Sequence, residues 1–185
     1  MATIREENSL DGEFKYMGLP YNVVKLEVYN PDWPKQFEQE KEEILSVVKN
    51  SSIAICHIGS TSIPNMTAKP IIDIMVGVDN NNEYDSTTKS LISIGYHCLG
   101  ECGRPDRIFF VKGSSDNNTH HLHLVTKGSS YWVENLAFRE YLRQNSKAAN
   151  EYQALKIDLA HKYRDNRTMY RIAKSYFIDE ILQRL

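Results

Sequence analysis

The chain has 185 residues, of which 41% are hydrophobic and 25% charged, and its 22 Lys and Arg against 24 Asp and Glu give a net charge of -2. This balance excludes the basic composition of a dedicated DNA- or RNA-binding protein. No apolar run approaches the roughly 20 residues that a membrane span needs, and residues 1–14 lack the apolar core of a secretory signal. Three cysteines do not make a disulfide framework. We expect a soluble, cytoplasmic protein with one domain at 21–185, after a polar, mobile lead-in at 1–20.

The first half of the chain is expected to alternate strands with helices. Residues 23–29 (VVKLEVY) alternate apolar and polar side chains, which predicts a strand at a sheet edge. A helix is expected over residues 33–48, because apolar side chains recur there at helical spacing after Asn30 and Asp32. The further predicted elements are strands at 53–58, 71–78, 97–99, 107–112 and 120–126, a loop or short helix at 59–70, and a helix at 84–94.

From Trp132 to the end of the chain the apolar pattern is helical. Three-residue and four-residue steps between apolar side chains recur within residues 135–143, 151–163 and 171–185. Because the strands come first and the helices last, the sequence predicts an α+β domain with a C-terminal helical layer.

A short polar segment, GSTS at residues 59–62, directly follows a predicted buried strand, and Asp73 stands on the next strand. A Gly-Ser turn that leaves a strand exposes backbone N–H groups and hydroxyls that can hold a phosphate. A carboxylate on the neighbouring strand can hold Mg²⁺ against the same phosphate. The candidate phosphate ligands are Gly59, Ser60, Thr61, Ser62, Lys69, Arg107 and Lys112.

Each of these features also has a structural interpretation. GSTS is a common turn composition, and most such turns bind nothing. An ionised carboxylate among Ile, Met and Val residues is costly to bury without a partner. Asp73 therefore either serves a ligand or forms a structural ion pair with Lys69 or an arginine. Arg107 either binds phosphate or solvates a loop.

The predicted strand at 120–126 carries an H-x-H pair. Because side chains alternate along a strand, His121 and His123 share one face while Leu122 and Leu124 face the core. Two imidazoles on one face can contact a metal ion or a phosphate. The alternative is an ordinary pair of hydrogen-bonded histidines.

Several blocks of the chain, in this order, resemble the GrpB family. The opening VYNPDWPKQFEQEK resembles that family's N-terminal signature, and the resemblance runs from about residue 23 to residue 162. The other blocks are HIGSTSIP at 57–64, KPIIDIMV at 69–76, RIFFVKG at 107–113, THHLHLV at 119–125 and ENLAFREYLR at 134–143.

The resemblance implies the nucleotidyltransferase superfamily core, a small mixed sheet flanked by helices. Gly59-Ser60 matches the superfamily's turn, and Asp73 matches its first carboxylate. Met75 stands where a second carboxylate would come, which puts metal binding and catalysis in doubt. His121 or His123 lies roughly where a third ligand would come, and Glu101 and Glu134 are further carboxylate candidates.

The resemblance implies an enzyme that moves a nucleotidyl group from a nucleoside triphosphate to a small acceptor. In this role Asp73, His123 and Lys112 are the expected catalytic residues, and Asp73, His121 and His123 the expected ligands of Mg²⁺, Mn²⁺ or Zn²⁺. Lys69 and Lys112 would stabilise the leaving pyrophosphate. The alternative, suggested by Met75, is a non-catalytic module that binds a nucleotide or another phosphorylated small molecule.

Overall fold

The computed structural model describes residues 24–114 and 117–185. The predicted lead-in at residues 1–20 lies outside them. The helices and strands of the described residues are α2 (Trp33–Val47), β1 (Ala54–Ile58), the 3-10 turn η1 (Ser60–Ser62), β2 (Ile72–Val78), η2 (Asn81–Glu83), α3 (Tyr84–Ser93), β3 (His97–Cys98), β4 (Arg107–Ser114), β5 (Asn117–Thr126), α4 (Ser130–Gln144), α5 (Ser146–Lys162) and α6 (Arg167–Leu182).

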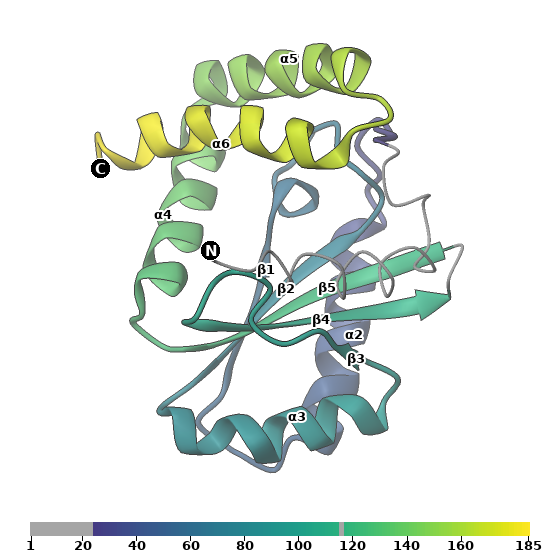
Figure 1. Ribbon diagram of the computed structural model, residues 1–185, viewed down its shortest axis with the longest axis vertical. Helices are drawn as coiled ribbons and strands as arrows, with labels where there is room; N and C mark the ends of the chain where they lie inside the picture. Colours follow the sequence, from purple (N-terminus) through teal and green to yellow (C-terminus); the bar gives the residue numbers. More distant parts are fainter. Residues whose placement is uncertain (1–23, 115–116) are drawn as a thin grey trace, which may run out of the picture.

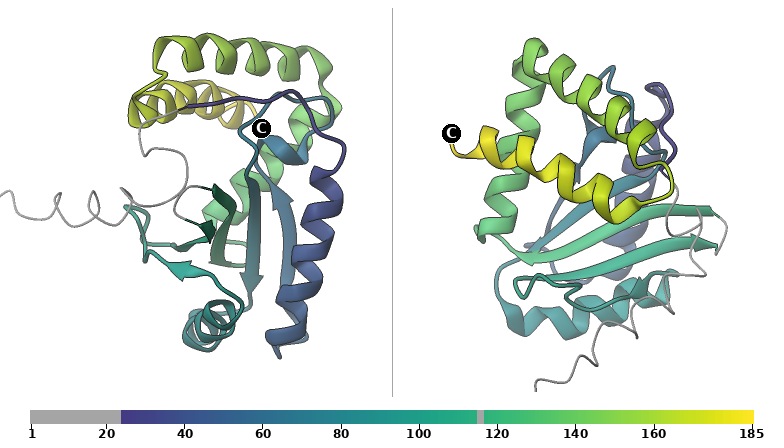
Figure 2. Two further views of the ribbon diagram at one scale, coloured as in Figure 1. Left: turned by 90° about the vertical axis from the view of Figure 1, so that its right-hand side faces the viewer. Right: turned by 45° about the horizontal axis from the view of Figure 1, so that its top comes forward.

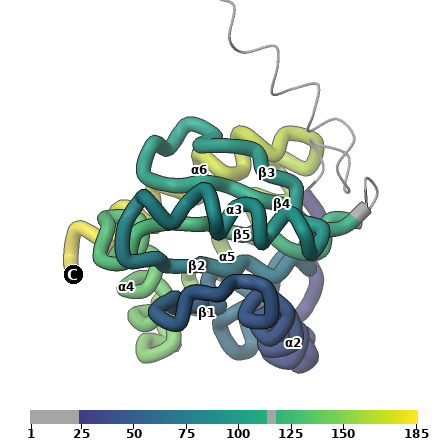
Figure 3. Tube along the Cα trace, turned by 90° about the horizontal axis from the view of Figure 1, so that it is seen from below, coloured from purple at the N-terminus to yellow at the C-terminus, as the bar shows by residue number. Residues whose placement is uncertain are grey.

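Within the described residues, the strands form one five-stranded sheet in the order β1-β2-β5-β4-β3. Strands β2 and β5 pair in parallel, whereas the other neighbours pair antiparallel, so the sheet is mixed. The view from below in Figure 3 shows the strands in this order, with α2 beside β1. The expected α+β class with a small mixed sheet and a C-terminal helical layer is confirmed.

Alternation along β2 gives the sheet two different faces. Ile72, Ile74, Val76 and Val78 are buried against α2 and α3 in the largest apolar core. Asp73 and the other odd-numbered residues point to the opposite face. There α4 packs through Tyr131 and Trp132 on an apolar cluster of Ile58, Met75 and Val125.

Helices α5 and α6 lie across the end of the sheet where β1 ends and β2 begins (Figure 1). The two further views in Figure 2 show the same layer above the sheet, with α2 running along one side of it. Ile63 and Met66, just after η1, pack against Leu142 of α4 and against Tyr152 and Ile181 of this layer. The Gly-Ser turn is thus held between the sheet and the C-terminal helices.

The predicted strand at 23–29 is wrong for the residues that the structure describes. Its backbone makes one isolated bridge, between Glu27 and Ala68. Val24 is buried with Leu159 and Tyr170 of the C-terminal helices, whereas Val28 is 80% exposed. The alternating pattern therefore packs a coil segment on helices instead of adding a strand to the sheet.

In the part of the chain that the structure describes, no helix is long and apolar enough to cross a membrane.

Candidate functional site

The Gly59 turn packs directly on the Asp73 carboxylate. Strand β1 ends at Ile58, and Gly59 follows with φ +69, a conformation that glycine adopts without strain. A Cβ atom at Gly59 would lie less than 3.0 Å from Oδ2, Cβ and Cγ of Asp73. A glycine is required here because any side chain would collide with the carboxylate.

Two arginines of α4 form hydrogen bonds with backbone carbonyl oxygens on either side of the turn. Arg139 Nη1 donates to the His57 carbonyl oxygen at 2.7 Å, and Arg143 donates to the Ser62 carbonyl oxygen from Nε at 3.1 Å and from Nη2 at 2.8 Å. Both arginines also pair with Glu140, at 2.7 and 3.3 Å. The sequence suggests only surface ion pairing at these positions, so their hold on the turn is a positioning role that it does not reveal.

The three hydroxyls of the turn have different environments. Thr61 is buried, and its Oγ1 donates to the Ile71 carbonyl oxygen at 3.3 Å and lies 3.0 Å from His57 Nε2. Ser62 Oγ donates to the Gly59 carbonyl oxygen at 2.6 Å. The structure thus uses the predicted phosphate ligands Thr61 and Ser62 to maintain the turn. Ser60 lies near Tyr152 of α5, and of the turn residues it is Gly59 that packs on the carboxylate.

Asp73 and His121 form a hydrogen-bonded pair on neighbouring strands. Asp73 Oδ1 lies 3.0 Å from His121 Nδ1, and the Asp73 side chain is 29% exposed. Burial favours the neutral acid, but the hydrogen bond and charge of His121, with His123 and Lys69, hold the pKa of Asp73 below its usual range. Burial lowers the pKa of His121 against the attraction of Asp73. The carboxylate only accepts, so the neutral imidazole donates from Nδ1 and its Nε2 keeps a lone pair.

His123 has the opposite tautomer. Its Nδ1 lies 2.9 Å from the Tyr131 hydroxyl and 3.3 Å from Arg107 Nη1. Burial lowers the pKa of His123 to about 3, so the ring is neutral. Arginine is only a donor, which means that Nδ1 accepts and the ring proton lies on Nε2. The predicted shared face of the H-x-H pair is confirmed, but His123 is placed as a hydrogen-bond donor and does not present a free nitrogen to a metal ion.

The residues present make an incomplete metal site. Within 24–114 and 117–185, no group of three or more His, Cys, Asp or Glu side chains is arranged to hold a metal ion. Met75 is fully buried in the apolar cluster of Ile58, Val125 and Tyr131, where a second carboxylate would come. Glu134 pairs instead with Arg104 at 3.8 Å. Because Mg²⁺ is often held by one or two carboxylates together with substrate phosphates and waters, Asp73 fits a metal that arrives with a phosphate ligand. His121 donates from Nδ1 to this carboxylate, so its Nε2 lone pair points away from Asp73 and the two side chains do not hold the same ion.

Lys112 does not belong to this site, and its predicted catalytic role is not compatible with its position. It lies on the opposite face of the sheet, where Nζ is 2.8 Å from Glu40 Oε1 and 2.7 Å from Glu43 Oε2. The reason is strand parity, since Lys112 shares the face of Ile108 and Phe110.

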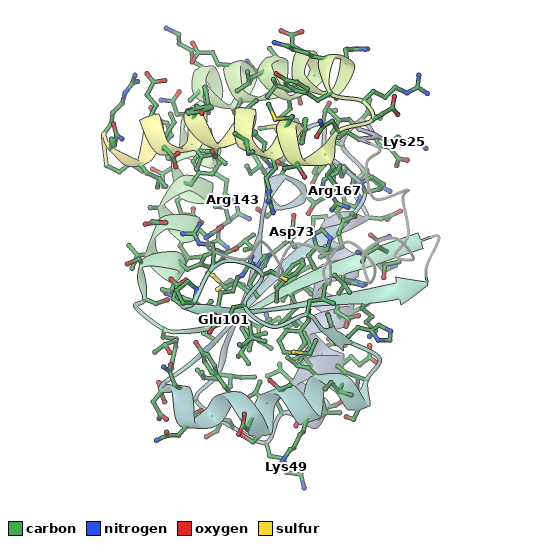
Figure 4. The ribbon with its side chains drawn as sticks, viewed as in Figure 1. Lys25, Lys49, Asp73, Glu101, Arg143 and Arg167 are labelled. Carbon is green, nitrogen blue, oxygen red and sulfur yellow. The ribbon has the colours of Figure 1, made fainter. Side chains whose placement is uncertain are left out.

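Cations of the C-terminal helices gather near Asp73, and sequence reasoning missed them. Burial and the charges of Arg167, Lys174 and Arg171, all on α6, hold the pKa of Lys69 well below its ordinary value, with Asp73 acting in the other direction. Figure 4 shows Arg167 on the α6 side of Asp73. No sequence motif marks these residues, because the fold alone brings α6 to the turn.

A further buried cation, Lys156 of α5, lies next to this group. It is 1% exposed, donates from Nζ to the Thr67 carbonyl oxygen, and lies 5.1 Å from the centroid of the Tyr152 ring. Burial, reinforced by the charge of Lys174, lowers the pKa of Lys156 to about 7. Lys69, Lys156, Arg167, Arg171 and Lys174 are called the cation cluster below.

Comparison with known proteins gives the family. The family model described as GrpB protein matches residues 23–184. The chain is 38% identical over 159 residues to UPF0157 protein YqkA of Bacillus subtilis, covering 86% of this chain but only 46% of YqkA. It is 32% identical over 173 residues to glutamate-rich protein GrpB of Alkalihalophilus pseudofirmus, covering 91% of this chain and 99% of that protein.

Solved structures support the same assignment. The crystal structure of conserved protein GrpB from Enterococcus faecalis matches with a TM-score of 0.77 and 34% identity, over 86% of this chain and 98% of that one. The Cid1 poly(U) polymerase bound to MgGTP matches with a TM-score of 0.50 and 9% identity, over 74% of this chain and 44% of that one. The second likeness concerns the fold alone. The chain belongs to the GrpB family and has a nucleotidyltransferase-like fold.

Proposed function

We propose that the protein binds a nucleoside triphosphate beside Asp73 and transfers its nucleotidyl group to a small acceptor. The observation that carries the proposal is the packing of the Gly59 turn on the Asp73 carboxylate, with Lys69 beside it and the α6 cations Arg167, Arg171 and Lys174 acting on Lys69. Like charges gathered in a partly buried region destabilise the free protein. A polyanionic ligand such as a triphosphate offsets that cost.

Each part of the site has a role in this proposal. The Gly59-Ser60 turn and the cation cluster would hold the β- and γ-phosphates. Asp73 is the residue that would hold a divalent cation, which when bound neutralises phosphate charge, and the hydrogen bond from His121 would orient its carboxylate. An acceptor oxygen would attack the α-phosphorus, the bond from that phosphorus to the bridging oxygen would break, and pyrophosphate would leave as the acceptor proton passes to solvent.

A second candidate function is a non-catalytic module that binds a nucleotide or another phosphorylated ligand. Met75 favours it, because this side chain is fully buried among apolar neighbours where a second carboxylate would complete a two-metal site. Such a module would use the same turn and cations but would release no pyrophosphate.

Calorimetric titrations with ATP, GTP, CTP and UTP, each in Mg²⁺, Mn²⁺ or EDTA, test the proposal. We expect metal-dependent binding of at least one triphosphate, followed by pyrophosphate release once an acceptor is supplied. Metal-independent binding with no pyrophosphate from any acceptor would favour the module. If none of the four nucleotides bound under any condition, the transferase would be rejected, and the module would need a phosphorylated ligand other than these nucleotides.

The variant Arg171→Gln, on the exposed part of the cluster, should weaken nucleotide affinity about tenfold, because it removes one charge-assisted contact. Arg184→Gln is the matched control. Arg184 is also exposed but lies beyond the end of α6, where it pairs with Glu180. Equal affinities of the two variants would show that the cation cluster does not hold the ligand.

A further inference from the structure

Arg107 of β4 is a buried cation that the proposed triphosphate site does not use. Arg107 is 9% exposed. Nη1 donates to His123 Nδ1 at 3.3 Å, and Nη2 donates to the carbonyl oxygens of Glu101 and Cys102 at 3.1 and 3.4 Å. Its hydrogen-bond partners are therefore an imidazole, the Tyr131 hydroxyl and two backbone carbonyls, none of which carries a negative charge.

The guanidinium lacks two things that a structural arginine usually has. Across 24–114 and 117–185, no carboxylate forms an ion pair with Arg107, and its buried Nε has no hydrogen-bond partner. Arginine stays charged in proteins, and an uncompensated buried charge is costly. The hydrogen bonds to Glu101 and Cys102 hold the preceding loop on the sheet, which gives Nη2 a structural role. They do not account for the unpaired Nε atom or for the absence of a negatively charged partner.

Arg104 places a second, accessible cation beside the first. Its guanidinium lies 5.1 Å from the centroid of the Tyr131 ring, and that of Arg107 lies 5.6 Å from the same centroid. The Arg104 side chain is 51% exposed, and its ion pair with Glu134 is long, at 3.8 Å, between two exposed groups. Such a pair contributes little, so Arg104 can turn to a ligand at small cost.

The two arginines and the cation cluster lie on different sides of Asp73. Arg107 shares the sheet face of Asp73, but it pairs with Val125 whereas Asp73 pairs with His121 at the other end of β5. In Figure 4, Arg167 lies on one side of Asp73 and Glu101, whose carbonyl accepts from Arg107, lies on the other. In a nucleotidyl transfer the acceptor approaches in line with the leaving pyrophosphate, from the opposite side of the reacting phosphorus.

We propose that Arg107 and Arg104 bind an oxyanion of the acceptor, a phosphate or a carboxylate, with Tyr131 between them. This inference rests on the proposed function and names the chemical class of its second substrate. The Nε–H group of Arg107 donates to the anion, and the Arg104 guanidinium on the Tyr131 ring supplies a second positive charge. The acceptor is then a small hydroxyl compound with a negative group, held with its hydroxyl toward Asp73.

Nuclear magnetic resonance of the arginine Nε–H groups tests the proposal directly. Protein labelled with ¹⁵N is saturated with Mg²⁺ and a non-hydrolysable ATP analogue, and inorganic phosphate or acetate is then titrated in separate experiments. Arg107→Lys identifies the Arg107 signal by its loss. We expect that signal to move with phosphate, with acetate or with both, and the anion that binds more tightly identifies the group on the acceptor.

Two variants keep the test specific. Arg104→Gln should weaken the anion affinity about tenfold, because one charge-assisted contact is lost, whereas the exposed Arg184→Gln should leave it unchanged. An Arg107 signal that neither anion moves would overturn the proposal, and so would equal affinities in the two variants. If the ATP analogue does not bind but phosphate still moves the Arg107 signal, the proposed function fails and the anion site stands. If the analogue binds and no anion moves the signal, the anion site fails alone.

Discussion

On the sheet face that carries α2 and α3, the buried carboxylate of Glu40 has a cationic partner, because Glu40 Oε1 lies 2.8 Å from Lys112 Nζ. On the opposite face, cations repel one another around Asp73, and the Arg107 charge has no carboxylate partner among the described residues. Paired charges need nothing further, whereas an uncompensated buried charge such as that of Arg107, and repulsion between neighbouring cations, destabilise the free protein. The difference indicates that the first polar group stabilises the fold and that the second serves a ligand.

The largest expected effect comes from closing the space between the turn and Asp73. Gly59→Ala should destabilise the protein by about 4 kcal/mol, because a Cβ at φ +69 is strained and also collides with the carboxylate. Gly103→Ala is the control, since Gly103 has φ +78 but open space around it, and should cost about 1 kcal/mol. Urea unfolding measures both. Equal losses would mean that the turn does not press on Asp73.

Removing the Asp73 charge tests the sheet face that we propose binds the nucleotide. Asp73→Asn should weaken nucleotide binding in Mn²⁺ about 100-fold, because an amide is a poor substitute for a carboxylate ligand. Asp79→Asn changes an exposed carboxylate paired with Lys127 and should leave the affinity unchanged. An Asp73→Asn protein that binds nucleotide as tightly as the original would contradict any role for Asp73 in holding a metal.

Substitutions on the sheet face that carries α2 and α3 should change the stability of the protein and not its affinity for nucleotide. Glu40→Ala should cost about 2 kcal/mol, because it leaves Lys112 with one exposed partner, while Glu43→Ala should cost less than about 1 kcal/mol. Thermal and urea unfolding give the two losses, and calorimetry should find nucleotide affinity unaltered in both variants. Weaker nucleotide binding in Glu40→Ala would remove the distinction between the faces.

The smallest effect is the pH dependence that Lys156 creates. Its pKa is about 7 in the folded protein and 10.5 ordinarily, so between these values the unfolded chain binds more protons and stability rises with pH. Lys156→Met should therefore gain stability relative to the original protein at pH 7. That advantage should shrink by about 1–2 kcal/mol at pH 9. Unfolding curves at the two pH values decide, and a constant difference would show that Lys156 is not buried as a cation.

Much of this site follows from strand parity together with the fold that the GrpB resemblance implies. Alternation along β2 and β5 predicts that Asp73, His121 and His123 share a face, and the structure has them there. The same rule already separates Lys112 from them, because it stands two residues from Phe110 on the apolar face. The charge of Lys112 serves Glu40 and Glu43 on that face.

Other features depend on contacts that no local pattern encodes. Lys156 and the α6 cations follow Asp73 by more than 80 residues, and only the packing of α5 and α6 over the end of the sheet brings them to it. The tautomers of the two histidines depend on Asp73 and on Arg107, which lie on different strands. In residues 24–29 the apolar side chains do alternate with polar ones, but they pack on the C-terminal helices instead of in a sheet.

One paired measurement tests the difference between the faces most directly: urea unfolding of Lys69→Met and Lys112→Met, each with and without a saturating Mg²⁺–nucleotide complex. Without ligand, Lys69→Met should be more stable than the original protein, because it removes the repulsion between Lys69 and the α6 cations. Lys112→Met should be less stable than the original protein, because it leaves the buried Glu40 carboxylate without its cationic partner. The nucleotide should stabilise Lys69→Met less than the original and Lys112→Met as much. A Lys69→Met protein that is less stable and gains full stabilisation from nucleotide would contradict the account.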